Sequence, residues 1–359
     1  MKFKKILEAA IQAPSGDNCQ PWRFEVGDDE IRVFNLPEKD DSLFNYRQHA
    51  SLVAHGALLE NLLIAASAQG YKAETALFPD KAEPNHIATI RLKNDSPPDE
   101  SLYPFISLRC TNRKRYDGAP LTDEQRSALL EMAESTGFGR LRLFEGMGKK
   151  ALTRIIALND RLVFENPNLH AFLFDHIRWN DREASKTRDG LDIKTLELAS
   201  SDVVAFRLLK NWPLLKTLNI FGVSRIVAGN AKKLAMSASA VGMITVPGNS
   251  SEDFISGGRL MERVWLEATR LGISFQLMTG ITCLMGKVMD GDFGGLSQEQ
   301  VGLVKEAHDE IARLCRIKGE TIVVMFRMGR SGPPTVRSLR VEIQYQEIND
   351  CTTRNDNKV

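Results

Sequence analysis

The sequence predicts an α+β fold built from two fused, related halves, each with a sheet packed against a buried helix. A repeat supports this prediction, because the helical segment that starts at Gly56 aligns with one that starts at Gly258, with Glu60 and Glu262 in register. Stretches rich in β-forming residues follow both copies, which indicates an internal duplication. The alternative, which the alignment leaves open, is two buried helices that resemble each other in composition alone.

The elements of the first half follow one another closely. Apolar residues at helical spacing predict a short helix over 3–13, which turn-forming residues end at Pro14. The longest element is a helix over Ser51–Gly70, which is apolar nearly all round and is therefore expected to be buried. The expected strands of this half are Arg23–Val26, Ile31–Phe34, Thr75–Phe78 and Ile87–Leu92.

The second half is longer because it carries a helical insertion from about residue 146 to residue 229. We expect this insertion to act as a lid that covers another part of the protein. Residues 1–100 are assigned to the first half, with a linker at 94–100; residues 101–345 are assigned to the second half and 346–359 to a frayed tail. The expected helices of the insertion are Lys150–Asn159, Leu169–Trp179 and Val203–Leu218, and the later strands are Ala240–Val246, Ser274–Met278 and Thr321–Met328.

Composition narrows the function classes. The 359 residues carry 47 basic and 46 acidic side chains, a formal net charge of +1, which gives no broad footprint for nucleic acid or for an anionic membrane. The five cysteines are widely spaced without a C-x-x-C pair, so we expect no metal site and a reduced, cytoplasmic protein. No secretory leader is expected, and no apolar run reaches the roughly 20 residues of a membrane helix.

Common catalytic and nucleotide-binding signatures are broken or missing from the sequence. The segment from Gly280 to Lys287 resembles a phosphate-binding loop, but it has one residue too many between its glycines and a valine where serine or threonine is needed. No G-x-G-x-x-G sequence follows a predicted strand, and no G-x-S-x-G sequence occurs. Nucleotide hydrolysis and serine-hydrolase chemistry are therefore not expected.

One motif is specific. Residues 13–22 read Ala-Pro-Ser-Gly-Asp-Asn-Cys-Gln-Pro-Trp, and this stretch resembles the A-P-S-x-x-N-x-Q-P-W loop of the FMN-dependent nitroreductase superfamily. In that family the loop approaches the pyrimidine edge of the flavin. An asparagine amide there can donate hydrogen bonds to the acceptors of the flavin and accept one from its donor. The resemblance implies FMN contacts from Pro14, Ser15, Gly16 and Asn18. The alternative is a capped helix end with a packed tryptophan.

A second element, Arg109-Cys-Thr111-Asn-Arg113, is similar to the basic-x-Ser/Thr-x-basic signature that grips the FMN phosphate in the same family. Two guanidinium groups and a hydroxyl can converge on one phosphate through charge-assisted hydrogen bonds. In the homodimeric family members one subunit supplies the loop and the other supplies the grip. Here both elements lie in one chain, in different halves, and the converse elements are missing. The chain thus resembles the long, single-chain Acg-type branch, a fused pseudo-dimer with one flavin site.

The resemblance implies further flavin contacts in the second half. Asn230 and Lys233 match a family Asn-x-x-Lys pair that reaches the flavin ring, where positive charge stabilises the reduced, anionic flavin. Thr279 and Gly280 lie in the segment whose backbone approaches flavin N5, and only a small residue lets the chain come that close.

Near the carboxy terminus, Arg337 and Arg340 resemble the basic pair that completes the family's phosphate site. Their spacing of three differs from the family's common spacing of two. Which of the two arginines touches the phosphate is therefore left open.

The function implied by the resemblance is that of an FMN-dependent oxidoreductase, with two-electron hydride transfer through flavin N5. NAD(P)H is the implied donor, and the acceptor is a nitroaromatic, a quinone or a similar conjugated molecule. Because the flavin is the reactive group, no catalytic side chain is expected. An FMN-storing protein with little turnover, which a lid would favour, and a flavin-fragmenting enzyme are the alternatives. The implied assembly is a monomer or a weak homo-oligomer.

Overall fold

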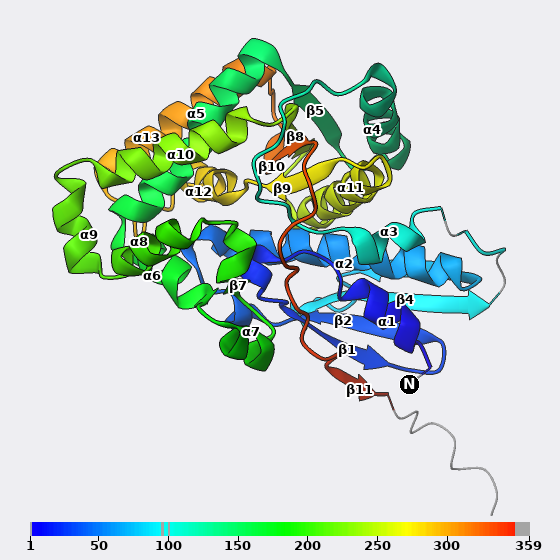
Figure 1. Ribbon diagram of the computed structural model, residues 1–359. Helices are drawn as coiled ribbons and strands as arrows, with labels where there is room; N and C mark the ends of the chain where they lie inside the picture. The colour runs from blue at the N-terminus through cyan, green and yellow to red at the C-terminus, as the bar shows by residue number, and fades with distance from the viewer. Residues whose placement is uncertain (1, 95–96, 100, 349–359) are drawn as a thin grey trace, which may run out of the picture.

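The computed structural model describes residues 2–94, 97–99 and 101–348 (Figure 1). Its strands form two main sheets, in the orders β11-β1-β2-β4-β3 and β5-β8-β10-β9. Helices pack against both sheets, so the predicted α+β class is confirmed. The strands of the first sheet are β1 (Trp22–Val26), β2 (Glu30–Asn35), β3 (Tyr71–Leu77), β4 (His86–Asn94) and β11 (Tyr345–Glu347); those of the second are β5 (Arg140–Phe144), β8 (Ala240–Val246), β9 (Ser274–Leu277) and β10 (Thr321–Gly329).

Among the helices, one prediction is wrong: the pattern over 203–218 forms two helices, α8 and α9. The side chain of Asn211 begins the second one by accepting a hydrogen bond from Leu214 N at 3.0 Å, and Pro213, which lacks an N–H, stands in its first turn. The helices of the insertion are α5 (Gly146–Glu165), α6 (Pro167–His176), α7 (Asp181–Thr187), α8 (Ser200–Leu209), α9 (Trp212–Asn219) and α10 (Val223–Met236); the others include α1 (Lys4–Ala10), α2 (His49–Ala68), α3 (Tyr103–Leu108), α4 (Asp123–Thr136), α11 (Ser251–Arg270), α12 (Gly280–Met289) and α13 (Gln298–Cys315).

Helices α2 and α11 cross in direct backbone contact at the centre of the molecule. A Cβ atom on Gly56 would lie 2.2 Å from the carbonyl oxygen of Ile255, and one on Gly258 would lie 2.1 Å from that of Val53. Only glycine at both positions permits this approach. Gly56 and Gly258 are also the residues that the repeat alignment places in register, so each helix meets the other at its equivalent position, as across a two-fold axis.

The glutamates that the repeat aligns are both fully buried beside this crossing. Glu60 of α2 forms ion pairs with Arg259 and Arg263 of α11, at 2.7 and 2.5 Å. Glu262 of α11 forms an ion pair with Arg109 at 3.0 Å. A buried carboxylate needs such a partner, because an unpaired buried charge destabilises a protein by several kcal/mol. Charged pairs therefore flank the glycine contact on both helices.

The chain after β10 leaves the second sheet and returns to the first. Figure 1 shows this segment as an extended strap that ends at β11. There β11 pairs in parallel with β1, with Tyr345 beside Phe24. Residues 346 and 347, expected in a frayed tail, belong to this strand because the edge of β1 offers them backbone hydrogen bonds. The rest of the predicted tail, from residue 349 on, and residues 95, 96 and 100 of the predicted linker lie outside the described residues.

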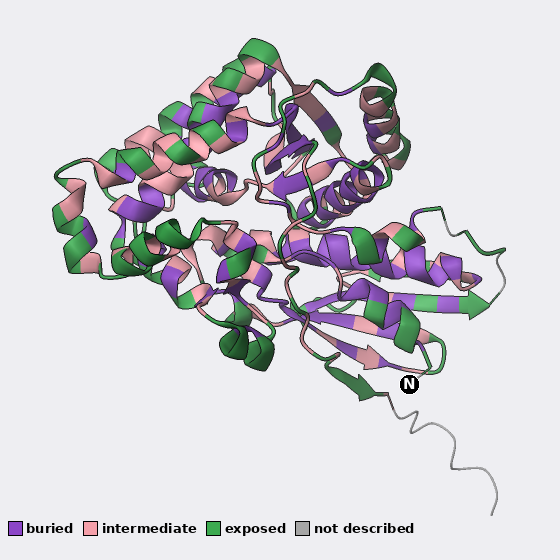
Figure 2. Cartoon of the chain, viewed as in Figure 1, coloured by how far each residue is buried: buried purple, intermediate pink, exposed green. Residues whose placement is uncertain are grey.

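One helical segment of the described residues, Leu43–Ala68, is long and apolar enough to cross a membrane. Its mean hydropathy is 1.4, and 78% of its most apolar stretch is buried inside the protein. Figure 2 shows α2 largely in the colour of buried residues. The burial expected for a helix that is apolar nearly all round is confirmed.

The glycine crossing predicts a specific pattern of stabilities. In Gly56→Ala the added methyl group meets backbone atoms that cannot rotate away, so the free energy of unfolding is expected to fall by about 1–3 kcal/mol. Gly302, in the middle of α13, has no atom within 4 Å of its Cβ position. Gly302→Ala is therefore the matched control and should raise the stability by up to about 1 kcal/mol. Urea denaturation of the three proteins measures both effects, and a Gly56→Ala variant as stable as the parent would contradict the crossing.

Candidate functional site

A large cavity lies between the two halves and the insertion. Its volume is about 1280 Å³, which exceeds the roughly 300–1,000 Å³ of ordinary small-molecule sites. The first half contributes the loop after α1 and residues between 40 and 54; the second contributes residues 111–115, 276–280 and parts of α11, α12 and β10. Helices α5, α6, α8 and α10 of the insertion complete the lining. A ligand that fills the cavity would contact all three parts.

The loop after α1 presents residues 14–17 to the cavity. Its backbone is strained, because Asp17, Asn18 and Gln20 have φ angles of 41°, 58° and 52°. Such conformations cost on the order of 1–3 kcal/mol each for residues other than glycine. Ser15 helps to hold the loop by accepting a hydrogen bond from Gln20 N at 2.9 Å. Strain that the surroundings maintain in this way is typical of ligand-binding segments.

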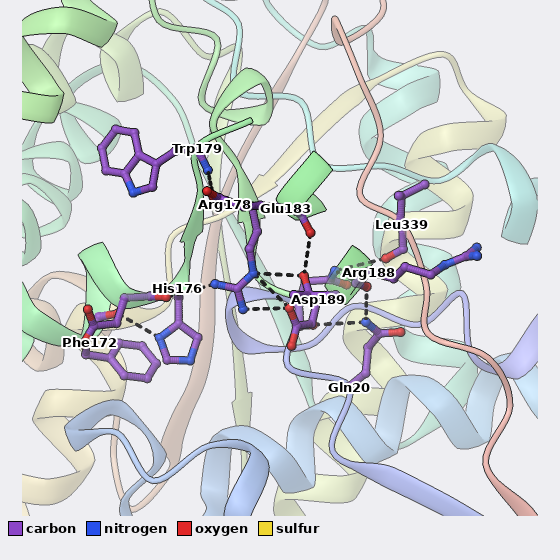
Figure 3. Close-up of polar contacts among 12 residues, drawn as sticks. Gln20, Phe172, His176, Arg178, Trp179, Glu183, Arg188, Asp189 and Leu339 are labelled. Carbon is purple, nitrogen blue, oxygen red and sulfur yellow. Dashed lines mark hydrogen bonds and ion pairs between the residues drawn. The ribbon is translucent and has the colours of Figure 1, made fainter. Parts of the chain in front are cut away.

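The side-chain amides of Asn18 and Gln20 hold neighbouring segments. Gln20 donates to the carbonyl oxygen of Arg188 at 2.9 Å (Figure 3). Asn18 donates to the carbonyl oxygen of Leu339 at 3.1 Å and accepts from the guanidinium of Arg340 at 2.9 Å. The side-chain amides of the motif thus join the loop to the insertion and to the carboxy-terminal strap. Asn18 does not line the cavity.

A tight turn after α7 brings the insertion to this loop. Arg178 and Asp189 form an ion pair across the turn at 2.7 Å, and Figure 3 shows them beside Arg188. Gly190 has a φ of 67°, and a Cβ there would lie 2.5 Å from the carbonyl oxygen of His176. Glycine is therefore required at this position for the turn to close and to present the carbonyl of Arg188.

Arg340 fixes the point where α1 ends and the loop begins. Its guanidinium donates to the carbonyl oxygens of Ile11 and Gln12, at 2.9 and 3.0 Å. A cation in this place satisfies carbonyls that the helix leaves free and interacts well with the helix dipole. Burial lowers the pKa of Arg340 to about 9, and nearby Arg109 adds to the decrease. The residue therefore positions the loop from behind.

Arg109, expected at the phosphate, is buried within the protein. It pairs with Glu262, its guanidinium lies 4.5 Å from the centre of the Trp265 ring, and it donates to the carbonyl oxygen of Gln12. Arg337 in turn donates to the carbonyl oxygen of Arg109 at 2.5 Å. Neither arginine lines the cavity.

The loop that carries Thr111 and Arg113 is anchored to β9. Thr111 forms a bridge with Phe275, and the fully buried Arg327 supports the loop from β10. Arg327 donates to the side-chain oxygen of Gln276 at 2.7 Å and to the carbonyl oxygen of Lys114 at 2.8 Å. This network gives the loop a fixed position at the cavity wall.

Arg113 brings positive charge into the cavity. Burial lowers its pKa, while the carboxylates of Asp17 and Glu197 raise it. Its guanidinium donates to the carbonyl oxygen of Thr195 at 3.3 Å. Because arginine stays protonated even when buried, a permanent cation of the second half faces the loop of the first.

Five carboxylic side chains also line the cavity: Asp17, Asp40, Asp160, Glu197 and Asp202. Burial raises the pKa of Asp17, Asp40 and Asp160, and the pKa of Asp160 reaches about 6. Asp40 adds to the rise at Asp17, whereas His176 and Arg113 oppose it. Raised pKa values in a cavity are typical of functional sites.

The floor and roof of the cavity come from α12 and the insertion. Gly280 begins α12, and a Cβ there would lie 2.2 Å from the side-chain oxygen of Asn159 in α5. Asn230 of α10 lines the cavity, whereas Lys233, one turn later, is exposed and does not. The roof is mainly apolar and includes Ile156, Val163, Phe164, Phe172, Phe206, Leu209, Val223 and Val227.

The structure therefore divides the residues expected from the sequence into two groups. The cavity brings together Pro14, Ser15, Gly16, Thr111, Arg113, Asn230, Thr279 and Gly280; Asn18, Arg109, Lys233, Arg337 and Arg340 lie outside its lining. Sequence reasoning missed Asp17, which stands at a variable position of the motif. It also missed Asp40, Asp160 and Phe206, which belong to no motif.

No family model matches the chain. Among curated proteins, three from Mycobacterium tuberculosis are similar to it: the uncharacterized protein MT1398 (27% identity over 77% of this chain and 38% of that protein), Rv3131 (26%, 51% and 52%) and acg (25%, 78% and 80%). The names of the last two assign them provisionally as NAD(P)H nitroreductases. The chain is therefore similar to proteins of the nitroreductase superfamily, including the long Acg-type protein. The alignment spans only 38% to about half of the length of the first two relatives.

Solved nitroreductases are also similar to the chain, at low identity. One is the FMN-dependent nitroreductase NfnB from Mycobacterium smegmatis in complex with NADPH (12% identity, 66% of this chain, 92% of that chain, TM-score 0.37). Another is a nitroreductase with bound FMN from Bacteroides fragilis (10%, 71%, 97%, TM-score 0.36).

The chemistry of the cavity lining fits an FMN. Arg113, Lys114 and Arg115 supply the positive charge, and Thr111 the hydroxyl, that a phosphate group needs. The backbone at 14–17 and the start of α12 offer polar groups to a flat heterocycle. The volume leaves room for a second small molecule beside it.

Asp160 makes the stability of the protein depend on pH in a definite direction. Its pKa is about 6 in the folded protein, above its ordinary value of 3.8. Between these two values the folded state binds more protons than the unfolded state, so the free energy of unfolding falls as pH rises. Asp160→Asn is expected to abolish this fall, which amounts to at most about 3 kcal/mol. Urea unfolding at about pH 4 and about pH 7 measures it, with exposed Asp175→Asn as the control. An equal pH response of Asp160→Asn and the parent would contradict the assignment.

Proposed function

We propose that the chain binds one FMN in this cavity and works as an oxidoreductase that transfers two electrons between small molecules. Similarity to proteins that are named provisionally as NAD(P)H nitroreductases supports the reaction class. The observation that carries the proposal is the placement of Arg113, a partly buried cation of the second half. It faces Asp17, in the strained loop of the first half, across one cavity.

Each part of the lining then has a role. Arg113 and Thr111 would hold the phosphate, and the backbone at 14–17 would hold the pyrimidine edge. Asn230 and the small residue Gly280 would border the ring. When bound, FMN supplies hydride chemistry at N5. The apolar roof of the insertion would exclude water from this ring.

The proposal includes a fused pseudo-dimer, with residues 1–100 as one half and 101–345 as the other. Support comes from Gly56 and Gly258, which are equivalent in the repeat and meet in the structure. We propose that the chain keeps one flavin site because the loop and the phosphate-binding segment each survive in only one half. Four cysteines of the described residues are free thiols: Cys19, Cys110, Cys283 and Cys315. Free thiols support a cytoplasmic setting.

For the electron donor we propose NADH or NADPH, and for the acceptor a nitroaromatic, a quinone or a similar conjugated molecule. Storage of FMN is the second candidate, and one observation favours it: helices α5, α6, α8 and α10 cover the cavity and would slow the entry of a donor. Anaerobic mixing of the flavin-loaded protein with NADH or NADPH separates the two candidates. Rapid bleaching of the flavin absorbance supports the oxidoreductase, and the absence of bleaching with both donors supports storage.

The phosphate assignment predicts the effect of Arg113→Ala. Removal of a charge-assisted contact costs about 1.5–3 kcal/mol, so FMN affinity is expected to fall roughly ten- to hundredfold. Arg313 is exposed on α13, away from the cavity lining, and Arg313→Ala should leave the affinity unchanged. Quenching of flavin fluorescence on titration measures both. Equal affinities of the two variants would reject Arg113 as a phosphate ligand.

A further inference from the structure

The corner of the insertion formed by α8, α9 and α10 exposes an unusual amount of apolar surface. Half of the exposed large apolar side chains of the described residues fall between positions 198 and 226. Ile220 and Phe221, in the turn between α9 and α10, are 80% and 78% exposed. Figures 1 and 2 place α9 at an outer edge of the molecule, with exposed residues along it. The other members of this corner surface are Leu198, Val204, Leu208, Leu214 and Ile226.

The same segment is strongly basic. Between Leu198 and Met236 there are six lysines and arginines and one acidic residue, Asp202, whereas the whole chain has a net charge of +1. Within the described residues none of the six takes part in an ion pair. A mixture of exposed apolar side chains and unpaired basic ones is typical of helices that lie on an anionic lipid surface. The six are Arg207, Lys210, Lys216, Arg225, Lys232 and Lys233.

The corner surface also surrounds the mouth of the cavity. Helices α8 and α10 line the cavity with one face and form the corner with the other. Ile226 belongs to both, since it lines the cavity and is 61% exposed. Leu198 and Asn230 likewise line the cavity and are exposed. The cavity therefore reaches the outside between these helices, in the middle of the basic and apolar surface.

We propose that this corner is a docking surface for anionic phospholipid bilayers, which sets the mouth of the cavity against the lipid. An apolar molecule dissolved in the bilayer could then enter the apolar roof without crossing water. That such a molecule is the electron acceptor rests on the proposed function, whereas the lipid contact does not. A second copy of the chain is disfavoured as the occupant, because two surfaces with the same concentrated positive charge repel each other. No membrane contact was expected from the net charge of the whole chain, which is +1. That value hides the local positive charge of this segment, because acidic residues elsewhere in the chain balance it.

Co-sedimentation with lipid vesicles tests the proposal. The full chain is expected to bind vesicles of phosphatidylcholine mixed with phosphatidylglycerol, to bind pure phosphatidylcholine much more weakly, and to be released by salt. A basic residue near an anionic surface contributes about 1 kcal/mol, or about fivefold in affinity, so Lys210→Gln with Lys216→Gln should weaken binding about thirtyfold. Protein with bound FMN and protein without it should bind the vesicles equally well. The result of this test therefore does not depend on the proposed function.

The matched control is Lys81→Gln with Lys318→Gln, which removes the same charge from exposed positions elsewhere. This variant should bind vesicles as the parent does, and thermal unfolding checks that both variants remain folded. Failure of the parent to bind the anionic vesicles, or equal loss in both double variants, would overturn the proposal. So would a stable dimer in sedimentation equilibrium that Ile220→Ser with Phe221→Ser splits, because the corner would then bind a second copy.

Discussion

The contact between Gly56 and Gly258 sets the distance between the two halves, and the rest of the structure depends on it. A Cβ on either residue would collide with backbone of the opposite helix. Because α2 and α11 touch without intervening side chains, the loop after α1 and the loop at 111–115 come to face one cavity. The buried ion pairs of Glu60 and Glu262 add a geometric constraint beside this contact, since neither carboxylate can leave its arginine partners without a large cost.

Residues that do not line the cavity hold its wall in position. Arg340 satisfies the carbonyls at the end of α1, Asn18 and Gln20 bind the strap and the insertion, and Arg327 supports the opposite loop. The strap thus connects both sheets and also holds the strained loop in place. Strain at 17–20 persists only because these contacts over-determine the backbone there. A functional loop and its supports are therefore one unit, although the strap lies more than 300 residues from the loop in sequence.

Sequence reasoning reached the fold class, most strands of the two main sheets and a part of the cavity lining, because the repeat and two motifs fix residue types at definite spacings. It missed β5 and β11. It could not tell which residues of a motif face the cavity: Asn18 and Arg109 have the expected types but bind protein groups. Asp160 was missed because its raised pKa arises from burial by distant elements. The break between α8 and α9 was missed because apolar spacing continues across Asn211. The basic corner at 203–236 was missed because only the net charge of the whole chain was considered.

The central claim is that two fused halves, held at the glycine crossing, retain a single flavin site. Its most direct test is the amount of FMN that one chain binds. Flavin-free protein is titrated with FMN to saturation, and the flavin released by denaturation is measured against the protein concentration. The account predicts one FMN per chain. Two per chain would show that both sites survive, and a protein that takes up none would contradict the assignment of the cavity.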